Sequence, residues 1–326
     1  MARRCRGSGQ RTSAEAGHAV TDVALIPAFV NPGSGNSEKA REALASSGRF
    51  DIRETQPARL DEEIRKAVKA GAKRILVAGG DGSICTGAGA ICGTEVELAV
   101  LPAGTLNHFA IDSGIPADLA EAARVGVGTA TATVDVGYAG DRVFLNTSSI
   151  GAYVTFVRLR DRLEKRFGYR LASLIAMIRI FVMLPTIGVQ IEVDGVTQIY
   201  RTPLVFIGVG ERELQLPILG SRVKGGKHGL HVFVLRGRKR ARLFVMALAA
   251  VSRGVDTVRR MPELDALLVD HFTIDMKRRG TMVAFDGETE LMTLPLEYRI
   301  ERDALRIVVP EPTPNVAGAP PPAPES

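Results

Sequence analysis

Three glycine-rich segments, each placed directly after a short apolar run, constrain the fold of this chain more than any other feature. The runs Val23–Val30, Arg74–Ala78 and Glu97–Leu101 have the length and composition of buried strands. Apolar residues at helical spacing, such as those between Leu60 and Val68, lie between these runs. Strands that alternate with helices predict a parallel sheet covered on both faces, so the segments after the strands share its carboxyl edge.

The three segments are Asn31–Gly35 (NPGSG), Gly79–Ser83 (GGDGS) and Pro102–Asn107 (PAGTLN). Glycine lets backbone N–H groups converge on phosphate oxygens because no Cβ stands between them. A helix expected over Ile84–Ile91 would add the positive end of its dipole after the second segment. Each segment alone also fits an ordinary turn, but three at one edge of one sheet favour a phosphate-binding site.

Asp81 stands inside the second segment, where its carboxylate would repel phosphate unless a cation lay between them. Proteins hold Mg²⁺ with one or two carboxylates together with phosphate oxygens and water. The alternative is a turn aspartate that accepts a hydrogen bond from its own backbone. The flanking Gly80 and Gly82 favour the metal-linked role.

Beyond about residue 131 the pattern changes to that of a mostly antiparallel, β-rich domain, interrupted by two expected helices, Phe156–Met183 and Lys239–Val251. The expected strands are Thr133–Tyr138, Val143–Ser149, Gly188–Val193, Pro203–Val209, Leu230–Leu235, His271–Met276, Met282–Phe285 and Leu294–Ile300. The sequence therefore predicts an α/β domain over residues 21–135 and a β-rich domain over residues 136–310, whose last strands are free to return to the first domain. A disordered basic tail over residues 1–20 and a Pro/Ala-rich tail over residues 311–326 complete the chain.

The ordered combination of NPGSG, GGDGS and GTLN resembles the diacylglycerol kinase catalytic family, which includes bacterial lipid kinases and the sphingosine kinases. The resemblance runs from about Val23 to Val309. GGDG alone is shared with NAD kinases and phosphofructokinases. The resemblance to this family therefore depends on the presence of all three segments in this order. The resemblance implies an α/β nucleotide domain followed by a β-rich lipid domain, with ATP and Mg²⁺ in the cleft between them.

The resemblance also implies which residues contact the nucleotide and its metal. The nucleotide contacts are Asn31, Ser34, Gly35, Thr55, Gly79, Gly80, Asp81, Gly82, Ser83, Gly104, Thr105 and Asn107. The implied metal ligands are Asp81 and Glu288.

Asp286-Gly287-Glu288 follows an apolar strand of the second domain and matches the DGE motif of that family. Phosphoryl transfer needs a carboxylate that accepts or orients the proton of the attacking hydroxyl. We expect Asp286 and Glu288 to divide this task with metal binding, although the residues alone leave the two roles interchangeable. The alternative is a plain hairpin turn, which is the usual role of an Asp-Gly pair.

Five positions depart from the family pattern. Ser83 replaces a threonine, Cys85-Thr86 replaces Asn-Glu, and His108 replaces an aspartate after the third segment. His228 replaces the aspartate of an Asp-Gly-Leu motif that holds a structural metal in the family. Imidazole is a poor Mg²⁺ ligand, so we predict that this structural site is absent or altered.

Charge indicates an anionic partner. The net charge is +6 and the pI about 9.4, while aromatic content is 5% without tryptophan, which argues against nucleic acid. The expected helix Phe156–Met183 carries basic residues at Arg158, Arg162, Lys165, Arg166 and Arg170, and a second basic cluster follows at 236–242. Two interpretations stay open, a helix packed on its own domain or a basic surface that faces an anionic membrane.

The longest apolar region, Leu171–Val193, is broken by Arg179, Pro185 and Gly188, so we expect no spanning helix. The three cysteines, at 5, 85 and 92, fit reduced thiols better than a disulfide framework or zinc site. We therefore expect a cytoplasmic protein held peripherally at the inner face of the membrane, and the sequence leaves a homodimer open.

The sequence predicts a lipid kinase that moves the γ-phosphoryl group of ATP to a diacylglycerol-like hydroxyl. The first alternative is a kinase of a soluble substrate such as NAD, which shares GGDG but does not explain NPGSG. The second is a catalytically weak lipid- or nucleotide-binding protein, supported by His108 and His228.

Overall fold

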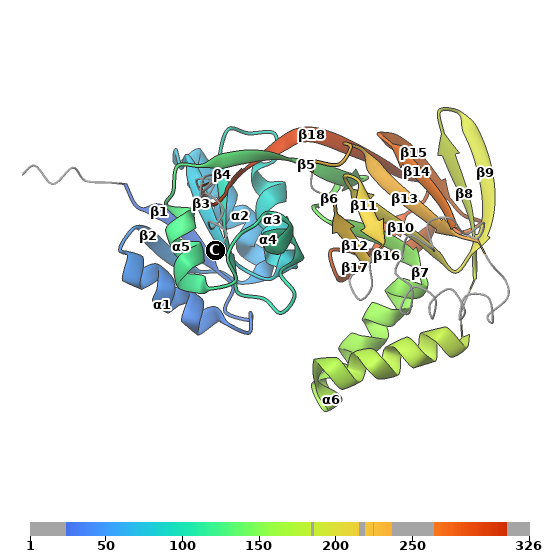
Figure 1. Cartoon of the computed structure of the whole chain (residues 1–326), viewed down its shortest axis with the longest axis horizontal. Coiled ribbons are helices and arrows are strands. Elements are labelled where there is room, and N and C mark those ends of the chain that lie inside the picture. The colour runs from blue at the N-terminus through green and yellow to red at the C-terminus, as the bar shows by residue number, and fades with distance from the viewer. Residues whose placement is uncertain (1–23, 184–185, 215–218, 224, 237–263, 312–326) are drawn as a thin grey trace, which may run out of the picture.

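The computed structural model describes residues 24–183, 186–214, 219–223, 225–236 and 264–311. The expected helix Lys239–Val251, the whole of the expected tail 1–20 and residues 312–326 of the expected second tail lie outside the described residues. Figure 1 shows two domains side by side, joined by the long strands β5 (Thr131–Ala139) and β18 (Leu296–Val308).

The first domain is the predicted α/β unit. Its parallel strands lie in the order β2-β1-β3-β4-β18. The strands are β1 (Ile26–Val30), β2 (Phe50–Glu54), β3 (Arg74–Gly79) and β4 (Glu97–Pro102). The helices are α1 (Ser37–Ser47), α2 (Pro57–Lys69), α3 (Asp81–Ile91), α4 (His108–Asp112) and α5 (Leu119–Gly126).

Burial explains why these segments form these elements. The side chains of β3 from Ile75 to Ala78 are fully buried on both faces of the sheet, which is why the strand reads as a continuous apolar run. Helix α2 buries Leu60, Ile64 and Ala67 at helical spacing and begins with Pro57, whose fixed φ suits the first helical turn.

The second domain packs two sheets of antiparallel strands face to face. The first sheet continues from β18 through β15, β8 and β9, and the second has the order β14-β13-β10-β7-β16-β17. The two predicted fold classes, a parallel α/β domain and a mostly antiparallel domain, are confirmed. The remaining strands are β6 (Arg142–Phe144), β7 (Thr147–Gly151), β8 (Ile187–Val193), β9 (Val196–Thr202), β10 (Leu204–Val209), β11 (Arg212–Leu214), β12 (Leu219–Arg222), β13 (Leu230–Leu235), β14 (Leu264–Val269), β15 (His271–Asp275), β16 (Gly280–Phe285) and β17 (Glu288–Thr293).

Strand β18 belongs to both domains. It pairs in parallel with β4 in the first domain and antiparallel with β15 in the second, while β5 runs beside it along most of its length. The register with β5 shifts between Glu301 and Leu305, where Asp303 adopts a left-handed φ of 52°. The sheet is therefore continuous from one domain to the other.

Two segments differ from the sequence expectation. The segment Val143–Ser149, expected as one strand, forms the separate strands β6 and β7. The expected helix over Phe156–Met183 begins earlier, as α6 (Ala152–Met183), and is bent at Gly168, whose φ of 71° and ψ of 163° are not helical. Glycine adopts this conformation without a clash because it has no Cβ. Within the described residues, no helix is both long and apolar enough to cross a membrane.

Candidate functional site

The residues that follow four neighbouring parallel strands form the first half of the candidate site. Asn31 follows β1 and Thr55 follows β2, while the second and third glycine-rich segments follow β3 and β4. Backbone hydrogen bonds connect the carboxyl ends of these strands. Asn31 N donates to Ala78 O at 3.0 Å, and Thr55 N donates to Val30 O at 2.9 Å. The convergence expected from parallel strand ends is therefore present.

The second and third segments touch backbone to backbone. A Cβ added at Gly104 would overlap the Cα of Gly80 and come within 3.1 Å of its nitrogen. Asn107, in a left-handed conformation with φ 52°, holds this turn, because its Oδ1 accepts from Gly104 N at 3.0 Å and its Nδ2 donates to Gly104 O at 2.9 Å. Thr105 is exposed beside them. Glycine at 104 is required for so close an approach, whereas a Cβ at Gly80 would make an ordinary contact of 3.4 Å with the Cα of Gly104.

The first segment is tied to the second through side chains. Asn31 Nδ2 donates to Ser83 Oγ at 2.9 Å, and Asn31 Oδ1 accepts from Gly33 N at 2.9 Å. Ser34 Oγ donates to Asn31 O at 2.9 Å. A Cβ at Gly35 would meet no atom within 4 Å, so this part of the segment borders open space.

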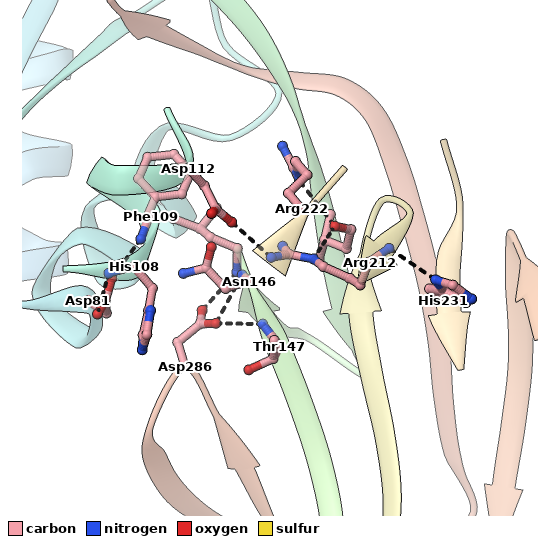
Figure 2. A network of polar contacts seen from close by, with 12 residues as sticks. Asp81, His108, Phe109, Asp112, Asn146, Thr147, Arg212, Arg222, His231 and Asp286 are labelled. Atoms are coloured by element: carbon pink, nitrogen blue, oxygen red, sulfur yellow. Dashed lines mark hydrogen bonds and ion pairs between the residues drawn. The ribbon is translucent and has the colours of Figure 1, made fainter. Parts of the chain in front are cut away.

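Asp81 links the second segment to the helix after the third. Its two carboxylate oxygens accept from the backbone N–H groups of His108 at 3.1 Å and Phe109 at 3.0 Å, at the start of α4 (Figure 2). A carboxylate has about four lone pairs, so these two bonds leave further lone pairs for a cation. The metal-binding role of Asp81 stays a prediction.

Asp286 is held by the break between β6 and β7. Its Oδ2 accepts from Leu145 N at 2.8 Å, and its Oδ1 accepts from Asn146 N at 2.9 Å and Thr147 N at 2.8 Å. The backbone of this segment turns toward the carboxylate instead of continuing one strand, which explains the difference from the sequence expectation. Burial raises the pKa of Asp286, the three N–H bonds oppose that rise, and the charge of Asp81 adds to it.

Glu288 reaches across to the first domain. A Cβ added at Gly82 would overlap Glu288 Oε1 and lie 2.6 Å from its Cδ. The Glu288 side chain is 62% exposed, and its Oε2 lies 3.5 Å from Arg142 NH2. The DGE segment of the second domain and the GGDGS segment of the first therefore form one site.

An ion pair between the domains was not foreseen from the sequence. Arg212 is only 1% exposed, and its NH1 lies 2.8 Å from Oδ2 of Asp112, the last residue of α4 (Figure 2). Its Nε donates to Val209 O at 2.9 Å, and its backbone N–H donates to His231 Nδ1 at 3.0 Å. Burial and then the charge of Arg222 lower the pKa of Arg212 to about 10. Nothing near Arg212 in the sequence signals this burial.

The two histidines that depart from the family pattern occupy different surroundings. His108 binds Asp81 through its backbone N–H. His228 Nδ1 lies 2.6 Å from Oδ2 of the buried Asp135, whose Oδ1 accepts from Asp303 N at 3.1 Å. The described residues contain no group of three or more His, Cys, Asp or Glu side chains placed to hold a metal ion.

Comparisons with known proteins agree with this arrangement. Residues 26–139 match the model of the diacylglycerol kinase catalytic domain. A protein of Pseudomonas syringae pv. syringae named "Probable lipid kinase YegS-like" is 28% identical over 301 residues, which cover 87% of this chain and 93% of that protein. A protein of Pseudomonas putida with the same name is 34% identical over 151 residues, covering 45% of this chain and 50% of that protein.

A solved structure shares the fold. The crystal structure of a diacylglycerol kinase from Bacillus anthracis str. Sterne superposes with a TM-score of 0.60 at 19% identity, covering 88% of this chain and 97% of that one. The matched domain, the similar proteins and the shared fold agree with the glycine-rich segments and the DGE motif. Residues 26–139 of the chain therefore match a diacylglycerol kinase catalytic domain, and 87% of the chain is similar to a protein named as a probable lipid kinase.

Proposed function

We propose that this protein transfers the γ-phosphoryl group of ATP to the hydroxyl of a diacylglycerol-like lipid, with Mg²⁺ as cofactor. The observation that carries the proposal is the contact between Glu288 and Gly82. It sets the two acids of the DGE motif beside a glycine-rich segment that has the features of a phosphate site. If Asp286–Glu288 formed only a hairpin turn, nothing would require Glu288 to lie against Gly82 of the other domain.

The three glycine-rich segments would bind the phosphates of ATP. The three segments meet at a common edge of the sheet, and α3 begins at Asp81 directly after Gly80, so its dipole favours negative charge there. The hydrogen bond from Asn31 to Ser83 fixes the first two segments relative to each other. This arrangement is preformed, which lowers the entropy lost when a nucleotide binds.

Asp81 and Glu288 fit the ligand set of a Mg²⁺ ion, because Mg²⁺ prefers carboxylate oxygens and is completed by phosphate oxygens and water. A protein-only cage of three or more ligands is not required for such a site. Bound there, the ion would neutralise negative charge on the β- and γ-phosphates.

Asp286 would orient the lipid hydroxyl. Three backbone N–H groups already bind its carboxylate, which leaves about one lone pair for the hydroxyl proton. The hydroxyl oxygen attacks the γ-phosphorus, the bond from that phosphorus to the bridging oxygen of ADP breaks, and Asp286 takes the hydroxyl proton. Its raised pKa makes it a better proton acceptor than an ordinary aspartate.

A lipid acceptor implies work at a membrane surface, and α6 has features that support peripheral docking. Figure 1 shows this bent helix projecting from the second domain. Basic residues at 158, 162, 165, 166 and 170 lie on its first half and at the bend, and each would add about 1 kcal/mol of attraction to an anionic surface.

The test is a transfer assay with labelled ATP and three acceptors in parallel: diacylglycerol in mixed micelles, a panel of other lipid alcohols, and NAD. We expect label in the lipid product and none in NAD. Label in NAD would favour the soluble-substrate alternative, and no turnover with any acceptor despite measurable ATP binding would favour a binding protein.

A further inference from the structure

Asn146 is a buried polar residue that belongs to neither the nucleotide site nor the metal site. It lies in the break between β6 and β7 and is only 5% exposed. Its backbone is held from two sides, because its N–H donates to Asp286 Oδ1 at 2.9 Å and its carbonyl oxygen accepts from Val209 N at 3.0 Å. The start of its side chain is therefore fixed beside the carboxylate that we assign to the acceptor hydroxyl.

The side-chain amide of Asn146 makes no hydrogen bond to any residue that the structure describes. By contrast, the amides of Asn31 and Asn107 each donate and accept hydrogen bonds within the glycine-rich segments. Buried polar groups are nearly always paired, since an unpaired one costs stability. An unpaired amide at this position is therefore best explained by a ligand that it binds.

The amide of Asn146 is directed toward the first domain. Figure 2 shows it pointing from the segment before β7 toward the side on which Asp81 and His108 lie. Asp81 is near enough to Asp286 that its charge raises the pKa of that carboxyl. The attacking hydroxyl and the γ-phosphoryl group would meet between these two acids, and the amide borders that region.

A neutral amide suits the chemistry of this position. The oxygen of an alcohol has two lone pairs, so one can attack phosphorus while the other accepts a hydrogen bond. A lysine or arginine there would pair with Asp286 and occupy the lone pair that the hydroxyl proton needs. The amide nitrogen of Asn146 donates to the hydroxyl oxygen without competing for that proton.

We propose that Asn146 is a further residue of the acceptor site, whose side-chain nitrogen donates a hydrogen bond to the oxygen of the alcohol that is phosphorylated. The inference rests on the proposed phosphoryl transfer and adds the group that recognises the acceptor hydroxyl. Asp286 on the proton and Asn146 on the oxygen together orient the hydroxyl for in-line attack. An analogue without the hydroxyl leaves the buried amide unpaired, so Asn146 also contributes to selectivity for alcohols.

The test compares Asn146→Ala and Asn146→Asp with the control Ser148→Ala, all in the full chain. Asn146→Ala removes the amide, and Asn146→Asp keeps its size but cannot donate. Ser148 is a suitable control because it lies on the same strand end, is 1% exposed, and its Oγ is 3.0 Å from the hydroxyl of the buried Tyr298. Its replacement disturbs a buried hydrogen bond away from the acids.

Two lipids are used in mixed micelles. One is diacylglycerol, or the lipid alcohol that the parent labels best, and the other is its deoxy analogue, in which hydrogen replaces the free hydroxyl and which serves as an inhibitor. Both Asn146 variants should lower kcat/KM for the alcohol by about tenfold, the value of one hydrogen bond. The KM for ATP and the Ki of the deoxy analogue should stay at the parent values, because neither involves the acceptor hydroxyl.

Stability provides a second readout. Asn146→Ala breaks no hydrogen bond, so its midpoint in urea should be no lower than that of Ser148→Ala, which leaves the Tyr298 hydroxyl unpaired but keeps the parent's turnover per folded molecule. Unchanged transfer in both Asn146 variants, an equal rise in the KM for ATP, or an equal rise in the Ki of the deoxy analogue would overturn the proposal. A parent that labels no lipid alcohol would instead refute the proposed kinase function, and this inference with it.

Discussion

The carboxylate of Glu288 lies against the Cα of Gly82, although one residue belongs to the second domain and the other to the first. Gly82 is in the first turn of α3, and Glu288 begins β17. A side chain at 82 would therefore displace a residue of the other domain. From the sequence alone, Gly82 is interpreted only as part of the phosphate-binding segment Gly79–Ser83, and its contact with Glu288 is not predicted.

Replacing Gly82 by alanine should move Glu288 rather than block the nucleotide. The new Cβ would overlap Glu288 Oε1, and Glu288 can give way because its side chain is mostly exposed. We expect turnover to fall by about 10²-fold or more, since one positioned acidic group is displaced, while ATP affinity changes by only a few-fold. Steady-state kinetics together with equilibrium ATP binding check this.

Gly188→Ala serves as the control, since a Cβ there meets no atom within 4 Å and its φ is not left-handed. It should leave both quantities unchanged. If Gly82→Ala abolished ATP binding, the phosphates rather than Glu288 would limit the space at residue 82.

The buried pair of Arg212 and Asp112 should hold the two domains together. Asp112→Asn removes the partner of a guanidinium that is 1% exposed, which leaves a buried charge without its counter-charge. Breaking such a pair costs about 3–5 kcal/mol. We expect a matching loss in the free energy of unfolding from urea titrations, and a smaller loss in the Asp112→Leu, Arg212→Met double variant than the sum of the single changes.

The surface pair of Arg41 and Glu54 provides the comparison. Both side chains are about half exposed, so Glu54→Gln should cost less than about 1 kcal/mol. Equal effects of Glu54→Gln and Asp112→Asn would contradict a special role for the buried pair.

Cys85 should make stability fall at alkaline pH. Burial raises the pKa of its thiol, and the charge of Asp286 raises it further. In the unfolded chain this thiol loses its proton near pH 8.5, whereas the folded protein keeps it. The unfolded state then binds fewer protons, so the free energy of unfolding falls as pH rises above about 8.5, by at most about 1.4 kcal/mol per pH unit.

The measurement compares urea unfolding of the parent and of Cys85→Ala between neutral and alkaline pH. The parent should lose stability more steeply than the variant above pH 8.5. Parallel curves would show that the thiol ionises equally in both states.

The sequence was sufficient for the features that depend on local pattern. Apolar runs that end in glycine predicted β3 and β4, and parallel strand ends predicted that the segments after them would converge. The apolar spacing of Leu60, Ile64 and Ala67 predicted α2. In each case the physical cause, burial on one face or a turn after a strand, acts within a few residues.

The rest depends on contacts between distant residues. The run Val143–Ser149 looks like one strand, and only the carboxylate of Asp286 explains why the backbone turns at Leu145 and Asn146. Burial of Arg212 depends on Asp112, which lies in the other domain. Neither partner is marked in the local sequence, so single-chain patterns could not reveal these contacts.

Asp286 and Glu288 should respond differently to the loss of their negative charge. Asp286→Asn puts an amide nitrogen opposite at least one of three backbone donors, so we expect a stability loss of about 1–3 kcal/mol together with a turnover loss of about 10²–10⁴-fold. Glu288→Gln changes an exposed side chain, so stability should stay within about 0.5 kcal/mol while most turnover is lost. Nucleotide binding should survive in both.

A second Asp-Gly pair in the chain separates chemistry from turn geometry. Asp194 and Gly195 join β8 to β9 with φ values of 50° and 78°, close to the 47° and 94° of Asp286 and Gly287. Asp194→Asn therefore makes the same change in the same kind of turn, far from the glycine-rich segments, and should leave turnover per folded molecule at the parent level. Turnover and thermal stability are measured on the same samples of all three variants. If Asp286→Asn and Glu288→Gln also stay within a few-fold of the parent, then the DGE segment is only a turn and the chemistry belongs to other residues.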